Sequence, residues 1–259
     1  MKIQHRRSAW AALLLALSAF AAHAADVTVV TSGAFTAAYK QLAPQYEHAT
    51  HNHLISEFGA SMGTTHDAIP MRLERGENVD VVIMASDALD GLMRQGKVKA
   101  GSRVDLVRSG IAMAVKAGAP KPDISTVDAL KRTLLGAKSI AYSDSASGVY
   151  LSTVLFPKLG VAERIKAKSH RIDGTPVGEA VARGAAEIGF QQISELKPVK
   201  GIDIVGPLPG AAQKITIFAA GVPASSKQPE AAKALIEWLA SPAARTAIEE
   251  SGLEPASTR

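Results

Sequence analysis

Four short turns rich in serine, threonine and glycine are the segments of this chain best suited to chemistry. Each follows an apolar run and precedes a stretch with helical periodicity; they span residues 31–33, 59–65, 143–148 and 173–175. The first turn of a helix carries unpaired N–H groups and the positive end of the macrodipole, so hydroxyl groups and glycines placed there can bind negative oxygens. A single such turn is more often an ordinary helix cap. Four turns that meet at one cleft would form an anion site.

These turns supply most of the candidate ligand residues. Those residues are Thr31, Ser32, Gly33, Ser61, Met62, Gly63, Thr64, Ser145, Ser147, Gly148 and, just beyond the third turn, Tyr150. Gln191 and Gln192 are further candidates, because an amide that both donates and accepts fits a flat carboxylate better than a tetrahedral oxyanion. The alternative for this pair is a strand end with surface amides.

Two side chains are candidates for moving a proton. His66 lies just beyond the second turn, and an unperturbed histidine titrates near neutral pH. Asp144 lies in the third turn and could serve instead. Each also has a plain structural reading, because a histidine in a first helical turn is often a solvated residue and an aspartate beside serines is often a helix cap. Both readings stay open at this point.

The sequence favours no metal and no cofactor. The three histidines His48, His51 and His53 fall where a helix should end in a loop, with no carboxylate spaced to complete a rigid metal site. The chain has no cysteine, which excludes thiol nucleophiles and iron–sulfur centres. It also lacks a P-loop, a dinucleotide fingerprint and a Gly-x-Ser-x-Gly elbow, so nucleotide-dependent and serine hydrolase readings have no support.

Apolar runs alternate with amphipathic segments along the chain, which predicts an α/β protein. Two long strand-like runs, 106–115 and 214–220, could cross between two lobes. The expected domains are a signal peptide at 1–24, a first lobe at 25–107 plus 218–259, and a second lobe at 108–217. Expected helices include 65–75, with Pro70 as an interior irregularity, and 149–159. All four turns follow predicted strands, where ligands of open α/β sheets bind.

The first 24 residues resemble a secretory signal, with Lys2, Arg6 and Arg7, an apolar run and an Ala22-His23-Ala24 cleavage motif. Export to the periplasm is therefore expected, and the apolar run is too short for stable membrane insertion. Without this segment the formal charge falls from +5 to +2, with 26 basic and 24 acidic residues. Scattered basic residues and 5% aromatic residues argue against nucleic-acid binding.

Several motifs together resemble the periplasmic molybdate-binding proteins of ABC transporters. They are 27–33 (VTVVTSG), 58–61 (FGAS), 75–83 (RGENVDVVI), 147–150 (SGVY) and 187–192 (EIGFQQ). The resemblance implies a two-lobed periplasmic substrate-binding-protein fold of type II, with two crossing segments, an interlobe cleft for an oxyanion and an ABC permease as partner. It also implies ligand roles for Ser61 and for the amide of Val177. The family's first-turn serine falls at Ala34 and its site tyrosine at Gln192, so the loss of two hydroxyls predicts a different ligand.

A long segment between Ser61 and Gly76, together with the block 142–150, resembles a branch of this family that includes periplasmic aconitate isomerase. This resemblance implies a small polycarboxylate as ligand and isomerisation of trans-aconitate to cis-aconitate by allylic proton transfer. Fixed N–H and hydroxyl donors would stabilise the charge that develops. The alternative is a non-catalytic receptor that delivers a molybdate-like oxyanion or an organic acid to a permease.

Overall fold

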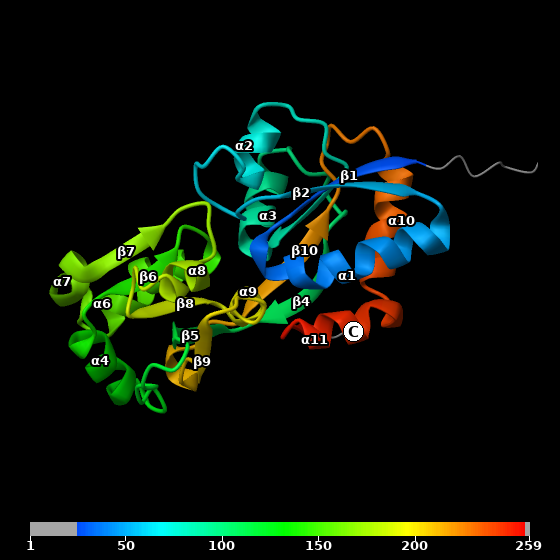
Figure 1. Cartoon of the computed structure of the whole chain (residues 1–259). Helices are drawn as coiled ribbons and strands as arrows, with labels where there is room; N and C mark the ends of the chain where they lie inside the picture. Colours follow the sequence, from blue (N-terminus) through cyan, green and yellow to red (C-terminus); the bar gives the residue numbers. More distant parts are fainter. Residues whose placement is uncertain (1–24, 257–259) are drawn as a thin grey trace, which may run out of the picture.

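The computed structural model describes residues 25–256, which form two α/β lobes side by side (Figure 1). The expected signal peptide at 1–24 lies outside the described residues. Each lobe contains one mixed sheet with helices against it, which confirms the α/β class and the two-lobed arrangement. No helix within residues 25–256 is long and apolar enough to cross a membrane.

The first lobe is built on a six-stranded sheet in the order β11-β4-β10-β3-β1-β2. Strands β1 and β2 are parallel, as are β1 and β3, whereas β10 runs antiparallel to β3 and β4. β3 is buried along its whole length, as its unbroken apolar sequence predicts. The strands are β1 (Asp26–Thr31), β2 (His53–Phe58), β3 (Val81–Ala85), β4 (Val104–Ser109), β10 (Thr216–Gly221) and β11 (Glu254–Pro255).

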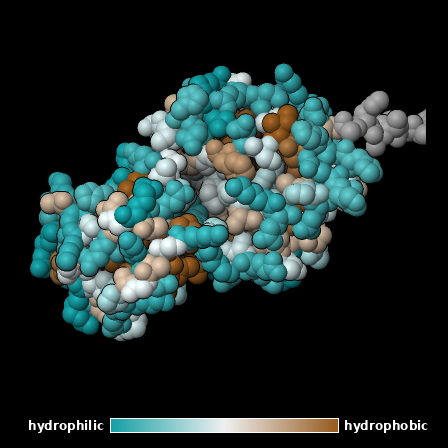
Figure 2. Space-filling model, in the orientation of Figure 1, coloured by the Kyte–Doolittle hydropathy of each residue, from teal (hydrophilic) through white to brown (hydrophobic). Residues whose placement is uncertain are grey.

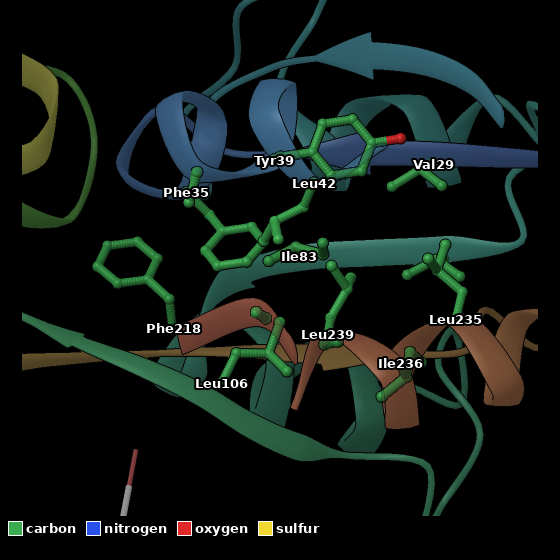
Figure 3. Packing of buried hydrophobic residues seen from close by; sticks show 14 of the residues in the cluster. Val29, Phe35, Tyr39, Leu42, Ile83, Leu106, Phe218, Leu235, Ile236 and Leu239 are labelled. Carbon is green, nitrogen blue, oxygen red and sulfur yellow. The ribbon is translucent and has the colours of Figure 1, made fainter. Parts of the chain in front are cut away.

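Helix α1 (Gly33–Thr50) supplies the centre of the first lobe's core. Its residues Phe35, Tyr39 and Leu42 face Ile83 on β3 and Leu235 on α10, where all five side chains are buried (Figure 3). Their spacing of three and four residues places them on one face of the helix, so burial of this stripe fixes how α1 lies on the sheet. The remaining helices of the lobe are α2 (Ile69–Glu74), α3 (Ser86–Arg94), α10 (Pro229–Leu239), η4 (Pro242–Ala244) and α11 (Arg245–Glu250).

The second lobe contains a five-stranded sheet in the order β7-β6-β8-β5-β9. β6 is parallel to β7 and β8, and β5 is antiparallel to β8 and β9. The strands are β5 (Ile111–Lys116), β6 (Ile140–Ser143), β7 (Ser169–Ile172), β8 (Ile188–Gln192) and β9 (Ile202–Pro207). The helices are α4 (Val127–Gly136), α5 (Ala146–Tyr150), η1 (Leu151–Leu155), α6 (Phe156–Lys158), α7 (Ala162–Ile165), η2 (Lys166–Lys168), α8 (Val177–Ala182), α9 (Ile193–Leu196) and η3 (Gly210–Ala212).

Two glutamine side chains hold the first crossing between the lobes. The Gln213 amide accepts from Ile111 N (2.8 Å) and donates to Ile111 O (2.9 Å), which reproduces the pairing of a neighbouring strand. In the orientation that satisfies its neighbours, the buried Gln192 amide donates to Gly110 O (3.1 Å) and Ser109 Oγ (2.9 Å). Hydrogen bonds from Gln192 and Gln213 therefore hold the backbone of the crossing at 109–111.

Three local expectations differ from the structure. The run 106–115 is not one strand, because it breaks at Gly110 into β4 in the first sheet and β5 in the second. The expected lobe limits at 107/108 and 217/218 fall inside β4 and β10, so the sheets assign Ser109 and Thr216 to the first lobe. Pro70 lies in the first turn of α2, where a missing N–H is tolerated, because the helix begins at Ile69 rather than at residue 65.

The segment 149–159 is helical as far as Lys158 but not uniformly α. It passes from α5 through the π-helical η1 to α6. The face of the molecule seen in Figure 2 is mainly hydrophilic, and hydrophobic residues appear on it as separate small patches. The folded surface thus matches a chain whose apolar residues are gathered in the cores of the two lobes.

Candidate functional site

A cavity of about 650 Å³ lies between the two lobes. The first lobe contributes α1 and the loop after β2, and the second contributes the loops after β6 and β7 together with α9 and the segment that follows it. All four turns identified in the sequence supply lining residues, namely Gly33, Gly59, Ala60, Ser143, Asp144, Ser145, Gly174 and Thr175. The four turns therefore converge on one interlobe space.

The predicted site residues divide into two groups in the structure. Those that line the cavity are Gly33, Asp144, Ser145 and Gln191. Those placed outside its lining are Thr31, Ser32, Ser61, Met62, Gly63, Thr64, His66, Ser147, Gly148, Tyr150, Val177 and Gln192. Ligand contact by any residue of the second group stays a prediction.

Several residues of the second group hold the turns in shape. Ser61 is buried, and its Oγ accepts from Ala85 N (2.9 Å), which ties the second turn to the end of β3. The Val177 amide donates to Gln191 Oε1 (2.8 Å). Tyr150 donates its hydroxyl to Ala212 O (3.0 Å). These donors and acceptors stabilise the walls of the cavity.

The Ser143–Gly148 turn is packed too tightly for a side chain at its last position. Ser143 Oγ and Ser147 Oγ are 3.0 Å apart, and Gly148 N donates to Ser143 Oγ (3.3 Å). A β-carbon at Gly148 would overlap the carbonyl group of Ser143. A glycine is therefore required here by close approach of the backbone, whether or not the turn touches a ligand.

Ser32, like Thr65 of the second turn, has a buried hydroxyl without a hydrogen-bond partner among the described residues. Its side chain is buried directly before α1, and its Oγ forms no hydrogen bond with the described residues. It also gives α1 no side-chain cap. The start of the 18-residue helix is thus left with unused donors next to the cavity residue Gly33.

His66 is exposed on the loop between β2 and α2. This loop is fixed by two arginines that bind its backbone: Arg75 Nη2 donates to His66 O (2.6 Å), and Arg72 Nε donates to Asp67 O (3.0 Å). Arg72 is held in turn by Glu77 (2.9 Å). The loop presents Asp67 rather than His66 to the cavity, and a catalytic role for His66 stays a prediction.

Asp144 lies where turns from opposite lobes meet. A β-carbon at Gly63 would be only 3.5 Å from Asp144 Oδ2, so the second and third turns face each other closely. Burial raises the pKa of Asp144, and the negative charges of Asp173 and Asp67 raise it further, whereas Arg171 opposes the shift. This carboxyl group therefore binds a proton more readily than an ordinary aspartate.

Glu195 also lines the cavity, although it is not among the residues predicted from the sequence. It is partly buried on α9, and Gln191 Nε2 donates to its Oε1 (2.9 Å). Burial raises its pKa to about 7, with the charge of Asp144 adding to the rise and the Gln191 hydrogen bond opposing it. The signal available in the sequence was a glutamate three residues after Gln192, just beyond a predicted strand.

Both signs of charge line the cavity. Four carboxyl groups, from Asp67, Asp144, Glu179 and Glu195, face two lysines, Lys40 and Lys200. Lys40 Nζ lies 4.9 Å from the centre of the Phe58 ring, a cation–π contact that leaves its charge available at the cavity. Within residues 25–256, no cluster of three or more histidine or acidic side chains could hold a metal ion.

The comparison with known families decides the classification. A family model described as bacterial extracellular solute-binding protein matches residues 27–254, which is nearly the whole described chain. The chain belongs to this family. Its two lobes and interlobe cavity are the expected features of a solute-binding protein.

Individual relatives of this solute-binding protein agree with the resemblances seen in its motifs. Aconitate isomerase from Pseudomonas sp. is 53% identical over 229 residues, which is 88% of this chain and 87% of that protein. Molybdate-binding protein ModA from Azotobacter vinelandii is 28% identical over 249 residues, covering 93% and 94% of the two chains. The sulfate-binding protein SubI from Mycobacterium tuberculosis H37Rv shares the fold, with a TM-score of 0.70, 17% identity and coverage of 90% and 88%.

Proposed function

We propose that this solute-binding protein is an isomerase that interconverts trans-aconitate and cis-aconitate. The observation that carries this proposal is a pair of carboxyl groups with raised pKa, those of Asp144 and Glu195, in an interlobe cavity that also holds Lys40, Lys200 and the Ser/Thr/Gly turns. A receptor for an anion loses affinity by facing it with carboxylates. An isomerase needs such groups, because they can accept and donate a proton. The 53% identical relative named aconitate isomerase supports the same conclusion.

The chemistry requires a 1,3-shift of one proton. A base removes a proton from the methylene carbon next to a carboxylate, and the C–H electron pair enters the allylic system. A proton is then added at the other end of that system, so the double bond moves and no oxidant or cofactor is consumed. Amides and hydroxyls of the turns would stabilise the negative charge that develops on the substrate carboxylates.

The direct test incubates the purified protein with trans-aconitate and, separately, with cis-aconitate, and follows both isomers chromatographically. Conversion in both directions to one common ratio is expected. Thermal-shift measurements with molybdate, tungstate and citrate accompany the assay. A large shift with molybdate and no conversion of either isomer would contradict the proposal.

The second candidate is a non-catalytic receptor that delivers an organic acid or an oxyanion to an ABC permease. The observation in its favour is the relationship to the molybdate-binding protein, together with a fold shared with other binding proteins. In the assay above, a thermal shift with aconitate but no interconversion would support the receptor. We also propose a periplasmic location, which fits both candidates and the family.

Lys40 is expected to bind a carboxylate of the substrate. Its exposed ammonium group stands at the cavity on α1, and a charge-assisted hydrogen bond contributes about 1.5 to 3 kcal/mol. Lys40→Met should therefore raise KM by about 10- to 100-fold and change kcat little. Steady-state kinetics with trans-aconitate measure both constants. Lys233→Met, on the exposed face of α10, is the matched control and should behave as the unsubstituted protein. An unchanged KM for Lys40→Met would remove this lysine from the site.

A further inference from the structure

We propose that Glu195 is the catalytic residue that removes and returns the substrate proton, and that Gln191 positions its carboxyl group. This inference rests on the proposed isomerisation and adds the identity of the proton carrier. Three features of Glu195 support it: its position against Gly33 of the other lobe, its hydrogen bond with Gln191, and the charged side chains around it.

The first observation is that α9 brings Glu195 to the boundary between the lobes. α9 begins directly after β8 in the second lobe and packs against α1 of the first lobe (Figure 1). A β-carbon at Gly33 would collide with Glu195 Oε1 and lie 2.9 Å from its carboxyl carbon. The carboxyl group therefore lies against the backbone of the first residue of α1. A substrate bound between the lobes would be adjacent to it.

The second observation is that the carboxyl group is held in one orientation. The Gln191 amide is buried and is fixed by accepting from Val177 N (2.8 Å), so its NH₂ group must point away from that N–H. That NH₂ group donates to Glu195 Oε1 (2.9 Å). One carboxyl oxygen is thus anchored through Gln191 to the first turn of α8. The other oxygen, Oε2, takes no part in the bond with Gln191, and we assign it the contact with the substrate C–H bond.

The charged surroundings suit a group that alternates between two protonation states. The titratable side chains that share the cavity with Glu195 are Lys40 from α1, Asp67 from the loop before α2, Asp144 from the loop after β6, Glu179 from α8, and Lys200 beyond α9. Burial and the nearby Asp144 hold the pKa of Glu195 at about 7. Near neutral pH both forms are populated, which is the most effective condition for general acid–base catalysis.

The proposed step is balanced without any further reactant. The Glu195 carboxylate accepts the methylene proton, and the C–H bonding pair becomes the new carbon–carbon double bond. The electron pair of the original double bond then takes the proton back from Glu195 at the far allylic carbon. The carboxylate is restored, and the substrate has gained and lost one proton.

The test compares Glu195→Gln with the unsubstituted protein. Because the amide cannot accept a proton, kcat should fall by about 10²- to 10⁴-fold while KM changes by only a few fold. In heavy water, deuterium should enter the methylene position of trans-aconitate with the unsubstituted protein, and this exchange, followed by proton NMR, should be lost in the variant. Glu163→Gln, an exposed glutamate of the second lobe, is the matched control and should retain full activity and exchange.

Two further measurements, the pH profile and the activity of Glu195→Asp, separate a catalytic role of Glu195 from a structural one. The kcat/KM of the unsubstituted protein should fall below pH about 7, because the base is then protonated. Gln191→Met removes a hydrogen bond that lowers this pKa, so the falling limb of its pH profile should move to higher pH. Glu195→Asp keeps a carboxyl group and should be measurably more active than Glu195→Gln, even if the glutamine variant folds poorly.

The outcomes distinguish this inference from the proposed function. Turnover and deuterium exchange at the unsubstituted rates in Glu195→Gln, with an active unsubstituted protein, would overturn the role of Glu195 and leave the isomerase intact. A large loss of kcat in His66→Ala or Asp144→Asn but not in Glu195→Gln would transfer the role to those residues. No conversion by the unsubstituted protein would overturn the function and this inference with it.

Discussion

Replacing Asp80 by alanine should lower the free energy of unfolding by about 3 to 5 kcal/mol, because it removes a buried carboxylate that accepts four hydrogen bonds. Asp80 is fully buried at the end of the loop before β3. Its Oδ2 accepts from Thr28 N (3.0 Å) on β1. Its Oδ1 accepts from Ser226 Oγ (2.8 Å), Lys227 N (3.0 Å) and Gln228 N (3.1 Å). One carboxylate thus joins the sheet to the start of α10, where the helix dipole favours negative charge.

Urea unfolding followed by circular dichroism measures this effect. Asp80→Asn keeps one oxygen acceptor, so we expect a smaller loss of about 1 to 3 kcal/mol. Asp26→Ala provides the matched control, since Asp26 lies on β1 but is exposed, and within residues 25–256 its carboxylate forms an ion pair with His53 alone, at 3.3 Å. That variant should change stability by less than about 0.5 kcal/mol. Equal losses for Asp80→Ala and Asp26→Ala would contradict the role assigned to Asp80.

Gly33→Ala should lower the turnover of aconitate by about 10²-fold while the fold persists, because displacement of a reacting group by about 1 Å can cost that much. The new methyl group would collide with Glu195 Oε1 at the end of that side chain and displace it from its hydrogen bond with Gln191, while the backbone stays in place. The backbone of Gly33 lies outside the left-handed region, so alanine is tolerated at the start of α1. The expected result is a strong loss of kcat with a melting temperature close to that of the unsubstituted protein.

The matched control for this prediction is Gly136→Ala at the end of α4. A β-carbon there meets no atom within 4 Å, and its backbone also lies outside the left-handed region. It should leave both turnover and the melting temperature nearly unchanged. If Gly33→Ala keeps the unsubstituted kcat, the contact between Gly33 and Glu195 has no part in the reaction.

The sequence was sufficient to predict the fold class because its signals are local. Alternating strand and helix patterns indicate two α/β lobes, and the Ser/Thr/Gly turns mark the ends of strands, where a cleft forms. The break at Gly110 was not predictable from the same signals. Strand-like residues lie on both sides of that glycine, Leu106 and Val107 before it and 111–115 after it, and only the separate pairing of β4 and β5 reveals that they belong to different sheets.

The candidate site was only partly predictable for a related reason. Glu195 lies on a helix of four residues, too short to show periodicity, and its burial arises because α1 packs against it from the other lobe. His66 illustrates the opposite case. Its position after a Ser/Thr turn suggests a place in the cleft, but the arginines of α2 and its cap bind the loop backbone and the side chain is left exposed. Contacts between residues far apart in the sequence therefore determine both the burial of Glu195 and the exposure of His66.

The contact between Glu195 and the start of α1 has a thermodynamic consequence for motion of the lobes. The Glu195 carboxyl group is shielded from water where the two lobes meet. When the lobes separate, water reaches it again, and its pKa falls toward that of an ordinary glutamate. Proton uptake and lobe closure are therefore linked, and each favours the other to the same extent. Mild acid should shift the population toward the closed form, and each opening in neutral solution should release part of a proton.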